Sequence, residues 1–260
     1  MNDFYVGYLP KAPTALAGFL RRIIVLLGFI GVAVALALVT AQMPFTKSAF
    51  EYGKIRQFEG IIEARPYPTL LVARPGEIGS GDQDSRYLLV APGKHGADGL
   101  IAAFDGKRIR LQGQLIYREN ETMIEIERGS ISPLNSPPAP QAPTVDMGPV
   151  TVTGEIVDSK CYLGVMNPGN GKVHRDCAAR CISGGIPPIF VSIDKGEQFL
   201  LVGADGDAIG PDALREFIAE PITVRGELLQ KEGSRFLRVD VEELHHTPHK
   251  VEAPPPASNF

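Results

Sequence analysis

The segment from Ile23 to Ala41 contains no charged residue and consists almost entirely of apolar side chains. A helix rises about 1.5 Å per residue, so roughly 20 apolar residues are enough to cross a hydrocarbon core about 30 Å thick. In lipid, a single segment of this kind can satisfy its backbone hydrogen bonds only as a helix. We therefore predict one transmembrane helix, over residues 21–43, which fixes where the rest of the chain can fold.

Charged residues beside this helix predict its orientation. Arg21 and Arg22 lie directly before the apolar segment, whereas the first cation after it is Lys47. Because positive charge stays in the cytoplasm, residues 1–20 should form a cytoplasmic peptide and the bulk of the chain should be periplasmic, as in a bacterial inner-membrane protein. A cleaved signal peptide is the alternative, since Val39-Thr40-Ala41 has the small residues of a cleavage site. The apolar segment is longer than the about 7–15 residues typical of a signal peptide, which favours an uncleaved anchor.

A sequence pattern occurs twice after the apolar segment. Each copy opens with a glycine, Gly60 or Gly154, inside a segment that alternates apolar and polar residues. Three later segments recur at a nearly constant offset: Tyr87 to Phe199 (112 residues), Ile109 to Ile222 (113) and Met123 to Phe236 (113). Such an offset over separated segments indicates two domains with the same fold.

The alternating segments predict half-buried β-strands, and a helical segment precedes the fourth strand of each copy, at 97–104 and at 211–219. The order β-β-β-α-β-β is that of the OB-fold, a five-stranded, partly open barrel. The predicted fold class is all-β, with two tandem OB-like five-stranded barrels behind one N-terminal transmembrane helix. The predicted segments after the helix are a first barrel over 54–131, a Pro-rich linker over 132–149, a second barrel over 150–244 and a disordered tail over 245–260.

All three cysteines of the chain lie in or beside an insertion that only the second copy has. From the opening glycine to the third strand, the second copy extends over 45 residues (154 to 199) and the first over 27 (60 to 87). The longer segment contains Cys161 and a predicted helix. On that helix His174, Cys177 and Cys181 stand at positions i, i+3 and i+7, and therefore share one face.

Three interpretations of this cluster stay open. A disulfide from Cys161 to Cys177 or to Cys181 would link the insertion covalently to the barrel. Cys177 and Cys181 lie one helical turn apart and point the same way, so they are not expected to pair with each other. A site of three thiolates and the His174 imidazole would bind zinc, and thiolates also suit Cu(I). A cysteine left over from a disulfide could serve in redox chemistry or covalent attachment. Asp158, beside the cluster, would either cap the loop or orient the histidine.

The segment from Gly154 to Phe190 resembles a pattern of small exported or membrane-anchored bacterial proteins with OB-like domains. The pattern reads Gly-x-Ile/Val-Val-Asp-x-x-Cys, then His-x-x-Cys-Ala-x-x-Cys, then Gly-Gly-x-Pro before a strand. The resemblance covers the second copy and implies no known activity. The first copy lacks the cysteine motif.

The composition excludes some classes of function. The 260-residue chain has a formal net charge of −4 and no block of basic residues after the apolar segment, which argues against nucleic acid as a partner. The sequence contains no Cys-x-x-Cys-His haem motif, no phosphate-binding glycine loop and no evident pair of nucleophile and base. These features favour a binding role over catalysis, with no nucleotide or haem as cofactor.

The sequence predicts a binding or assembly subunit of a membrane complex, with the bilayer and another membrane protein as partners. The cytoplasmic peptide supports this prediction, because it has apolar and aromatic residues where a solvated tail would be charged. The predicted partner-docking residues are Phe4, Tyr5, Tyr8 and Leu9. The alternative is a periplasmic metal-binding protein that holds zinc or copper at Cys161, His174, Cys177 and Cys181.

Overall fold

The computed structural model describes residues 14–42, 48–73, 84–135 and 143–246. The chain divides into two compact units, Met1–Lys47 and Ser48–Phe260. The predicted docking residues Phe4, Tyr5, Tyr8 and Leu9 lie outside the described residues.

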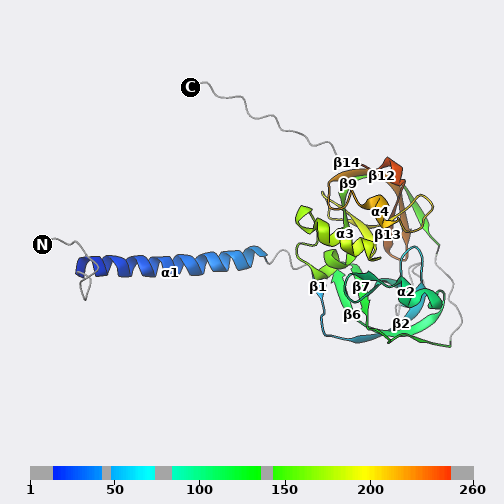
Figure 1. The fold of residues 1–260 in the computed structure, drawn as a ribbon, viewed down its shortest axis with the longest axis horizontal. Helices are drawn as coiled ribbons and strands as arrows, with labels where there is room; N and C mark the ends of the chain where they lie inside the picture. The colour runs from blue at the N-terminus through cyan, green and yellow to red at the C-terminus, as the bar shows by residue number, and fades with distance from the viewer. Residues whose placement is uncertain (1–13, 43–47, 74–83, 136–142, 247–260) are drawn as a thin grey trace, which may run out of the picture. The chain divides into compact units, whose positions relative to one another are not determined.

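The described part of the first unit is one helix, α1 (Thr14–Gln42) (Figure 1). Its segment Leu16–Ala41 is long and apolar enough to cross a membrane, with a mean hydropathy of 2.9 and no buried residues in the most apolar window. At 1.5 Å per residue those 26 residues extend over about 39 Å, more than a hydrocarbon core requires. The helix begins before Arg21 and Arg22, so both arginines are helical.

The second unit contains two closed five-stranded barrels, which confirms the predicted fold class. In the first barrel each strand pairs with the next around the ring, and the third and fifth strands, β4 and β7, run parallel. The ring order is β2 (Arg56–Glu63), β3 (Thr69–Ala73), β4 (Asp84–Ala91), β7 (Glu121–Ile126) and β6 (Arg108–Arg118), which closes on β2. The short elements around it are β1 (Ser48–Phe50), β5 (His95–Gly96), α2 (Asp98–Ile101), the 3₁₀ turn η2 (Ala102–Phe104) and β8 (Ser132–Pro133).

The second barrel repeats this ring, again with a parallel pair, β11 and β13. Its order is β9 (Val145–Asp158), β10 (Pro188–Ser192), β11 (Gln198–Val202), β13 (Ser234–Val239) and β12 (Ile222–Lys231). Before β12 lies α4 (Pro211–Leu214), and after β13 come the 3₁₀ turn η5 (Val241–Glu243) and β14 (His245–His246). β8 and the start of β9 fall inside the segment assigned to the linker, and β14 pairs with β12 inside the segment assigned to the tail.

Each barrel has its own apolar core, and a third core lies between the barrels. The alternation of side chains along a strand explains the division. On β4, Leu89 belongs to the core of the first barrel, whereas Leu88 and Val90 belong to the core between barrels. On the equivalent strand β11, Leu201 lies inside and Leu200 faces the first barrel. The two barrels therefore pack through corresponding strands.

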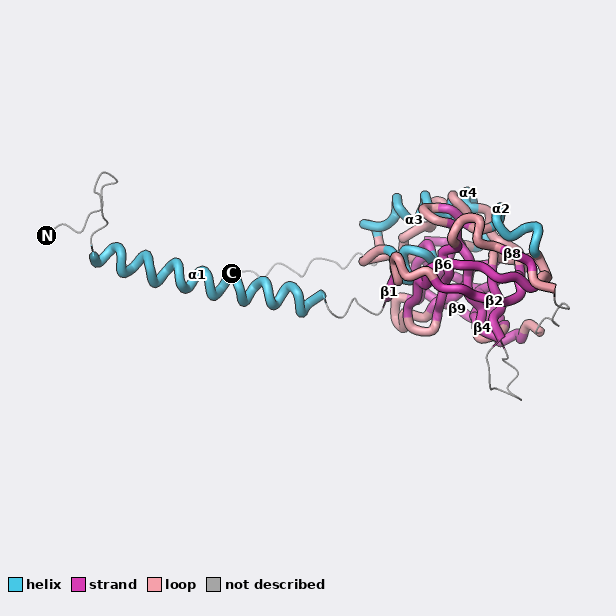
Figure 2. The backbone as a smooth tube through the Cα atoms, turned by 90° about the horizontal axis from the view of Figure 1, so that it is seen from below, coloured by secondary structure: helices cyan, strands magenta, loops and turns pink. Residues whose placement is uncertain are grey.

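The insertion of the second copy lies between β9 and β10. It comprises a π-helical turn, η3 (Cys161–Val165), a 3₁₀ turn, η4 (Lys172–His174), and a helix, α3 (Arg175–Ser183). In Figure 2, α3 lies with α2 and α4 along one side of the two barrels. Cys161 and Cys181 belong to the core between the barrels, so the insertion helps to join the two copies.

The opening glycine of each copy lies where two strands approach closely. A Cβ atom at Gly60 would lie 2.2 Å from the backbone oxygen of Leu71, and one at Gly154 would lie 2.2 Å from that of Val191. Backbone atoms cannot move aside without disturbing the strand pairing, so both copies need glycine at this position.

We expect Gly60→Ala to lower the stability of the protein, because overpacking of this kind costs about 1–3 kcal/mol. The melting temperature of the full-length protein in detergent should fall by about 2–4 °C for each kcal/mol lost. Gly99→Ala is the matched control, since a Cβ atom there meets nothing within 4 Å. Equal melting temperatures for the two variants would contradict this account of the repeated glycine.

Candidate metal centre

Two elements of the insertion bring the three cysteines together. Cys161 is the first residue of η3, shortly after β9 ends at Asp158. Its backbone N–H donates to Asp158 Oδ1 at 2.8 Å, which fixes the turn. Cys177 and Cys181 lie one turn apart on α3. The helix ends at Ser183, and the N–H of the next residue, Gly184, donates to the carbonyls of Arg180 and Cys181. The fixed turn therefore positions the sulfur of Cys161, and the capped helix positions those of Cys177 and Cys181.

The three Sγ atoms lie within 4.8 Å of one another. Those of Cys161 and Cys177 are 4.0 Å apart, and all three cysteines are free thiols in this structure. A metal–sulfur distance of about 2.3 Å places two thiolate ligands about 3.8 Å apart in a tetrahedron and about 4.0 Å apart in a trigonal plane. The spacing of Cys161 and Cys177 therefore fits two ligands of a shared metal ion.

The cluster is largely enclosed. Cys161 and Cys181 are only 4% and 1% exposed, whereas Cys177 is half-buried. An ion at the centre of the three sulfurs would therefore be reached from the side of Cys177.

The helical spacing predicted that His174 would share one face with Cys177 and Cys181. In the structure its ring does not belong to the group formed by the three sulfurs. The helix begins at Arg175, and His174 is the last residue of the preceding 3₁₀ turn. Its Nε2 lies 2.9 Å from Asp158 Oδ2, and both residues are buried. Its ring forms a second group of potential ligands, with Asp158 and Cys161, beside the three sulfurs. Asp158 thus fills both roles considered for it, capping the turn and orienting the histidine.

The first barrel contributes Lys94, a residue that the sequence analysis did not single out. Its Nζ donates to Cys177 Sγ at 2.8 Å and to Cys181 Sγ at 3.6 Å. Lys94 lies in the turn between β4 and β5, in a Pro-Gly-Lys-His-Gly loop with no metal-binding motif. Lys94 and Cys177 are 83 positions apart in the sequence. Their contact exists because one barrel packs on the other, so the sequence alone did not predict it.

Lys160, next to Cys161, holds that turn in place. Its buried ammonium donates to the carbonyl oxygens of Ala91 at 3.0 Å and Gly93 at 2.6 Å, and it pairs with the Glu125 carboxylate. The backbone N–H of Gly96 also donates to Gly184 O at 2.8 Å, at the end of α3. Residues from both barrels therefore fix the loop that presents Lys94.

Contacts within the cluster move the pKa values of its members in opposite directions. The hydrogen bond from Cys161 lowers the pKa of Cys181; burial and Asp158 oppose this effect, and Lys94 reinforces it. The same hydrogen bond, burial and the Asp158 carboxylate raise the pKa of Cys161. The hydrogen bond to Cys177 raises the pKa of Lys94, which therefore stays an ammonium. Cys181 thus becomes a thiolate more readily than Cys161.

No protein-family model, curated protein or solved structure matches this chain. Of the four predicted site residues, the structure brings Cys161, Cys177 and Cys181 into one cluster and places His174 beside it, next to Cys161.

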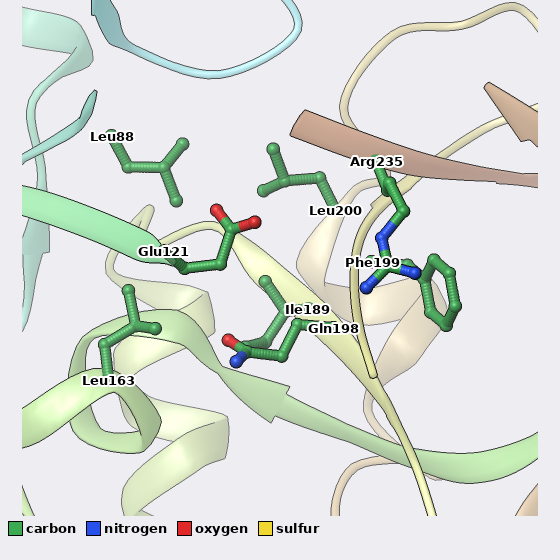
Figure 3. A pocket seen from close by; sticks show the side chains of 8 residues that line it. All are labelled: Leu88, Glu121, Leu163, Ile189, Gln198, Phe199, Leu200 and Arg235. Carbon is green, nitrogen blue, oxygen red and sulfur yellow. The ribbon is translucent and has the colours of Figure 1, made fainter. Parts of the chain in front are cut away.

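A small pocket adjoins this region between the barrels. Figure 3 shows the Glu121 carboxylate among apolar side chains, with Arg235 beside Phe199. The pocket is lined by Leu88, Glu121, Leu163, Ile189, Gln198, Phe199, Leu200 and Arg235. Burial raises the pKa of Glu121, although Arg235 and Arg86 act against the rise. This set contains no nucleophile paired with a base, so it does not point to catalysis.

Glu121→Gln should stabilise the protein at neutral pH, because it removes a carboxylate that is costly to ionise in the folded state. Because the pKa of Glu121 is raised in the folded protein, its carboxyl group keeps its proton to a higher pH there than in the unfolded chain. The wild type therefore loses stability as the pH rises from the unfolded to the folded pKa of Glu121. The advantage of the variant should therefore be absent at low pH and grow to a plateau above the folded pKa. Denaturant unfolding across pH measures it, with the exposed Glu243→Gln as the control. A constant difference across pH would contradict the prediction.

Proposed function

We propose that this protein is a membrane-anchored metal-binding protein that holds one thiophilic ion, zinc or copper, at Cys161, Cys177 and Cys181. The observation that carries the proposal is the convergence of three sulfur atoms within 4.8 Å of one another. Two of the three thiols are buried, as expected for a site that retains its ion. Soft thiolate ligands select Zn²⁺ or Cu(I) over harder cations.

We also propose the bacterial inner membrane as the location, with the N-terminus in the cytoplasm and the barrels in the periplasm. The apolar helix and the arginines near its start support this orientation. Protease added to the periplasmic side should cut residues after 43, and the protein should resist extraction by alkaline washing. The predicted role as a subunit of a membrane complex stays a prediction.

A metal titration tests the proposed function. The full-length protein, reduced and kept free of oxygen in mild detergent, is titrated with Cd²⁺ as a spectroscopic substitute for the native ion. We expect a sulfur-to-metal charge-transfer band that saturates at one equivalent per chain. The band should be lost when all three cysteines are replaced by serine and kept in His245→Asn, which changes an exposed histidine of β14. A band that survives in the triple variant, or no band in the wild type, would overturn the proposal.

A further inference from the structure

We propose that Lys94 of the first barrel makes this a three-coordinate site that prefers Cu(I) to zinc, an inference that rests on the proposed metal-binding function. The first barrel has no cysteine of its own, yet its turn between β4 and β5 places an ammonium on the cluster. Lys94 is thus assigned as a specificity-determining residue that does not itself bind the ion.

The number of available ligands favours Cu(I). Zinc in structural sites is almost always tetrahedral and needs a fourth donor. Among the described residues, no further Cys, His, Asp or Glu ligand atom lies within 4.8 Å of all three sulfurs. The ring of His174, the predicted fourth ligand, groups with Asp158 and Cys161 and not with all three sulfurs. Three thiolates without a fourth donor suit Cu(I), a soft ion that accepts trigonal coordination.

The side chain of Lys94 lies beside the sulfurs but cannot bind a metal ion. An ammonium has three donors and no lone pair, so Lys94 cannot serve as the fourth ligand. Its Nζ lies 2.8 Å and 3.6 Å from two of the three sulfurs, where it hydrogen-bonds the thiolates instead. The position beside Cys177, the most open of the three, is thereby taken by a group that cannot coordinate.

The charge of Lys94 also suits a Cu(I) site. Three thiolates and one Cu(I) carry a net charge of −2, which is costly to hold where two of the sulfurs are buried. Lys94 offsets one of these charges at hydrogen-bond distance. Lys160, the other nearby ammonium, is already paired with Glu125. Lys94 is therefore the cation that compensates the cluster directly.

The position of Lys94 is built into the fold. A Cβ atom at Gly184 would lie 1.9 Å from Lys94 O, so the glycine at the end of α3 lets this loop approach. Lys160 binds two carbonyl oxygens of the same loop. Residues of the insertion thus hold the loop of the first barrel against the cysteines, which gives the copy without cysteines a role in the site.

The experiment compares Cu(I) and Zn²⁺ binding to full-length wild type and Lys94→Met under anaerobic conditions, by competition with chelators. X-ray absorption of the Cu(I) form should show three sulfur neighbours and no nitrogen in the wild type and in His174→Gln. In Lys94→Met we expect the Cu(I) affinity to fall by about 10–100-fold, as for other residues that support metal ligands, and zinc affinity to fall less. The exposed Lys195→Met is the matched control and should change neither affinity.

Two outcomes would overturn the inference while metal binding stands. One is a bound ion with a nitrogen ligand that disappears in His174→Gln. The other is an equal loss of Cu(I) and zinc affinity, or no loss, in Lys94→Met. Failure of the wild type to bind Cu(I), Zn²⁺ or Cd²⁺ would instead overturn the proposed function itself.

Discussion

Cys161→Ser will remove most of the metal affinity of the protein. The loss should be much larger than the roughly 10–100-fold loss that follows when a residue that only supports a ligand is changed. Cys161 is the one proposed ligand that lies outside α3, and its Sγ is 4.0 Å from Cys177 Sγ. Its loss would leave two thiolates on a single helix. A serine hydroxyl is a poor ligand for a soft ion. The measurement is the metal-to-protein ratio after gel filtration, together with chelator competition.

His174→Gln is the control for this prediction, because glutamine can still hydrogen-bond Asp158. It should keep one ion per chain. Melting temperatures of both variants without metal separate loss of the site from loss of the fold. An unchanged metal ratio in Cys161→Ser would show that the ion lies elsewhere.

Arg86→Met should lower the free energy of unfolding by about 3–5 kcal/mol, the cost of leaving buried charges without their partner. Arg86 of the first barrel contacts Glu63 at 2.5 Å and Glu232 of the second barrel at 2.8 Å. The three side chains are only 3%, 9% and 3% exposed. Lys231 still pairs with Glu63, but Glu232 would lose its partner between the barrels.

Arg65→Met is the matched control for this second prediction. Arg65 also pairs across the barrels, with Asp207 at 2.9 Å, but these side chains are 79% and 47% exposed. Such a surface pair contributes about 0–1 kcal/mol. Chemical denaturation of the full-length variants in detergent measures both losses. Equal effects of the two substitutions would contradict the stabilising role of the buried ion pairs of Arg86.

The barrels could be predicted from the sequence because strand formation leaves a local signal. Alternation along each strand and the offset of 112 or 113 residues defined the order of elements without any knowledge of contacts. The packing of one barrel on the other could not be predicted in this way. Leu88 and Leu200 are apolar like their neighbours Leu89 and Leu201, and the sequence does not distinguish a core inside a barrel from one between barrels.

The candidate site was predicted in part for a related reason. Helical spacing placed Cys177 and Cys181 on one face, and the segment after the first strand brought Cys161 to them. For His174 the helix begins one residue later than predicted, and its ring groups with Asp158 and Cys161, so its role as a ligand stays a prediction. Lys94 has no sequence signal, since its role depends wholly on the contact between barrels.

The disulfide interpretation stays a prediction for the chain without metal. The Sγ atoms of Cys161 and Cys177 are 4.0 Å apart, about twice the S–S bond length of 2.03–2.05 Å, so a modest shift would let them pair under oxidation. A bound ion would prevent this, because its ligands are the same sulfur atoms. The two interpretations thus describe competing states of one cluster.

The most direct test of the central claim is to count metal ions and thiols in the intact protein. It is purified from membranes in mild detergent without chelator or added reductant, and its thiols are alkylated before and after the metal is removed. The account predicts one thiophilic ion per chain and three thiols that react fully only after its removal. No bound metal, with one reactive thiol and a disulfide that includes Cys161, would contradict it.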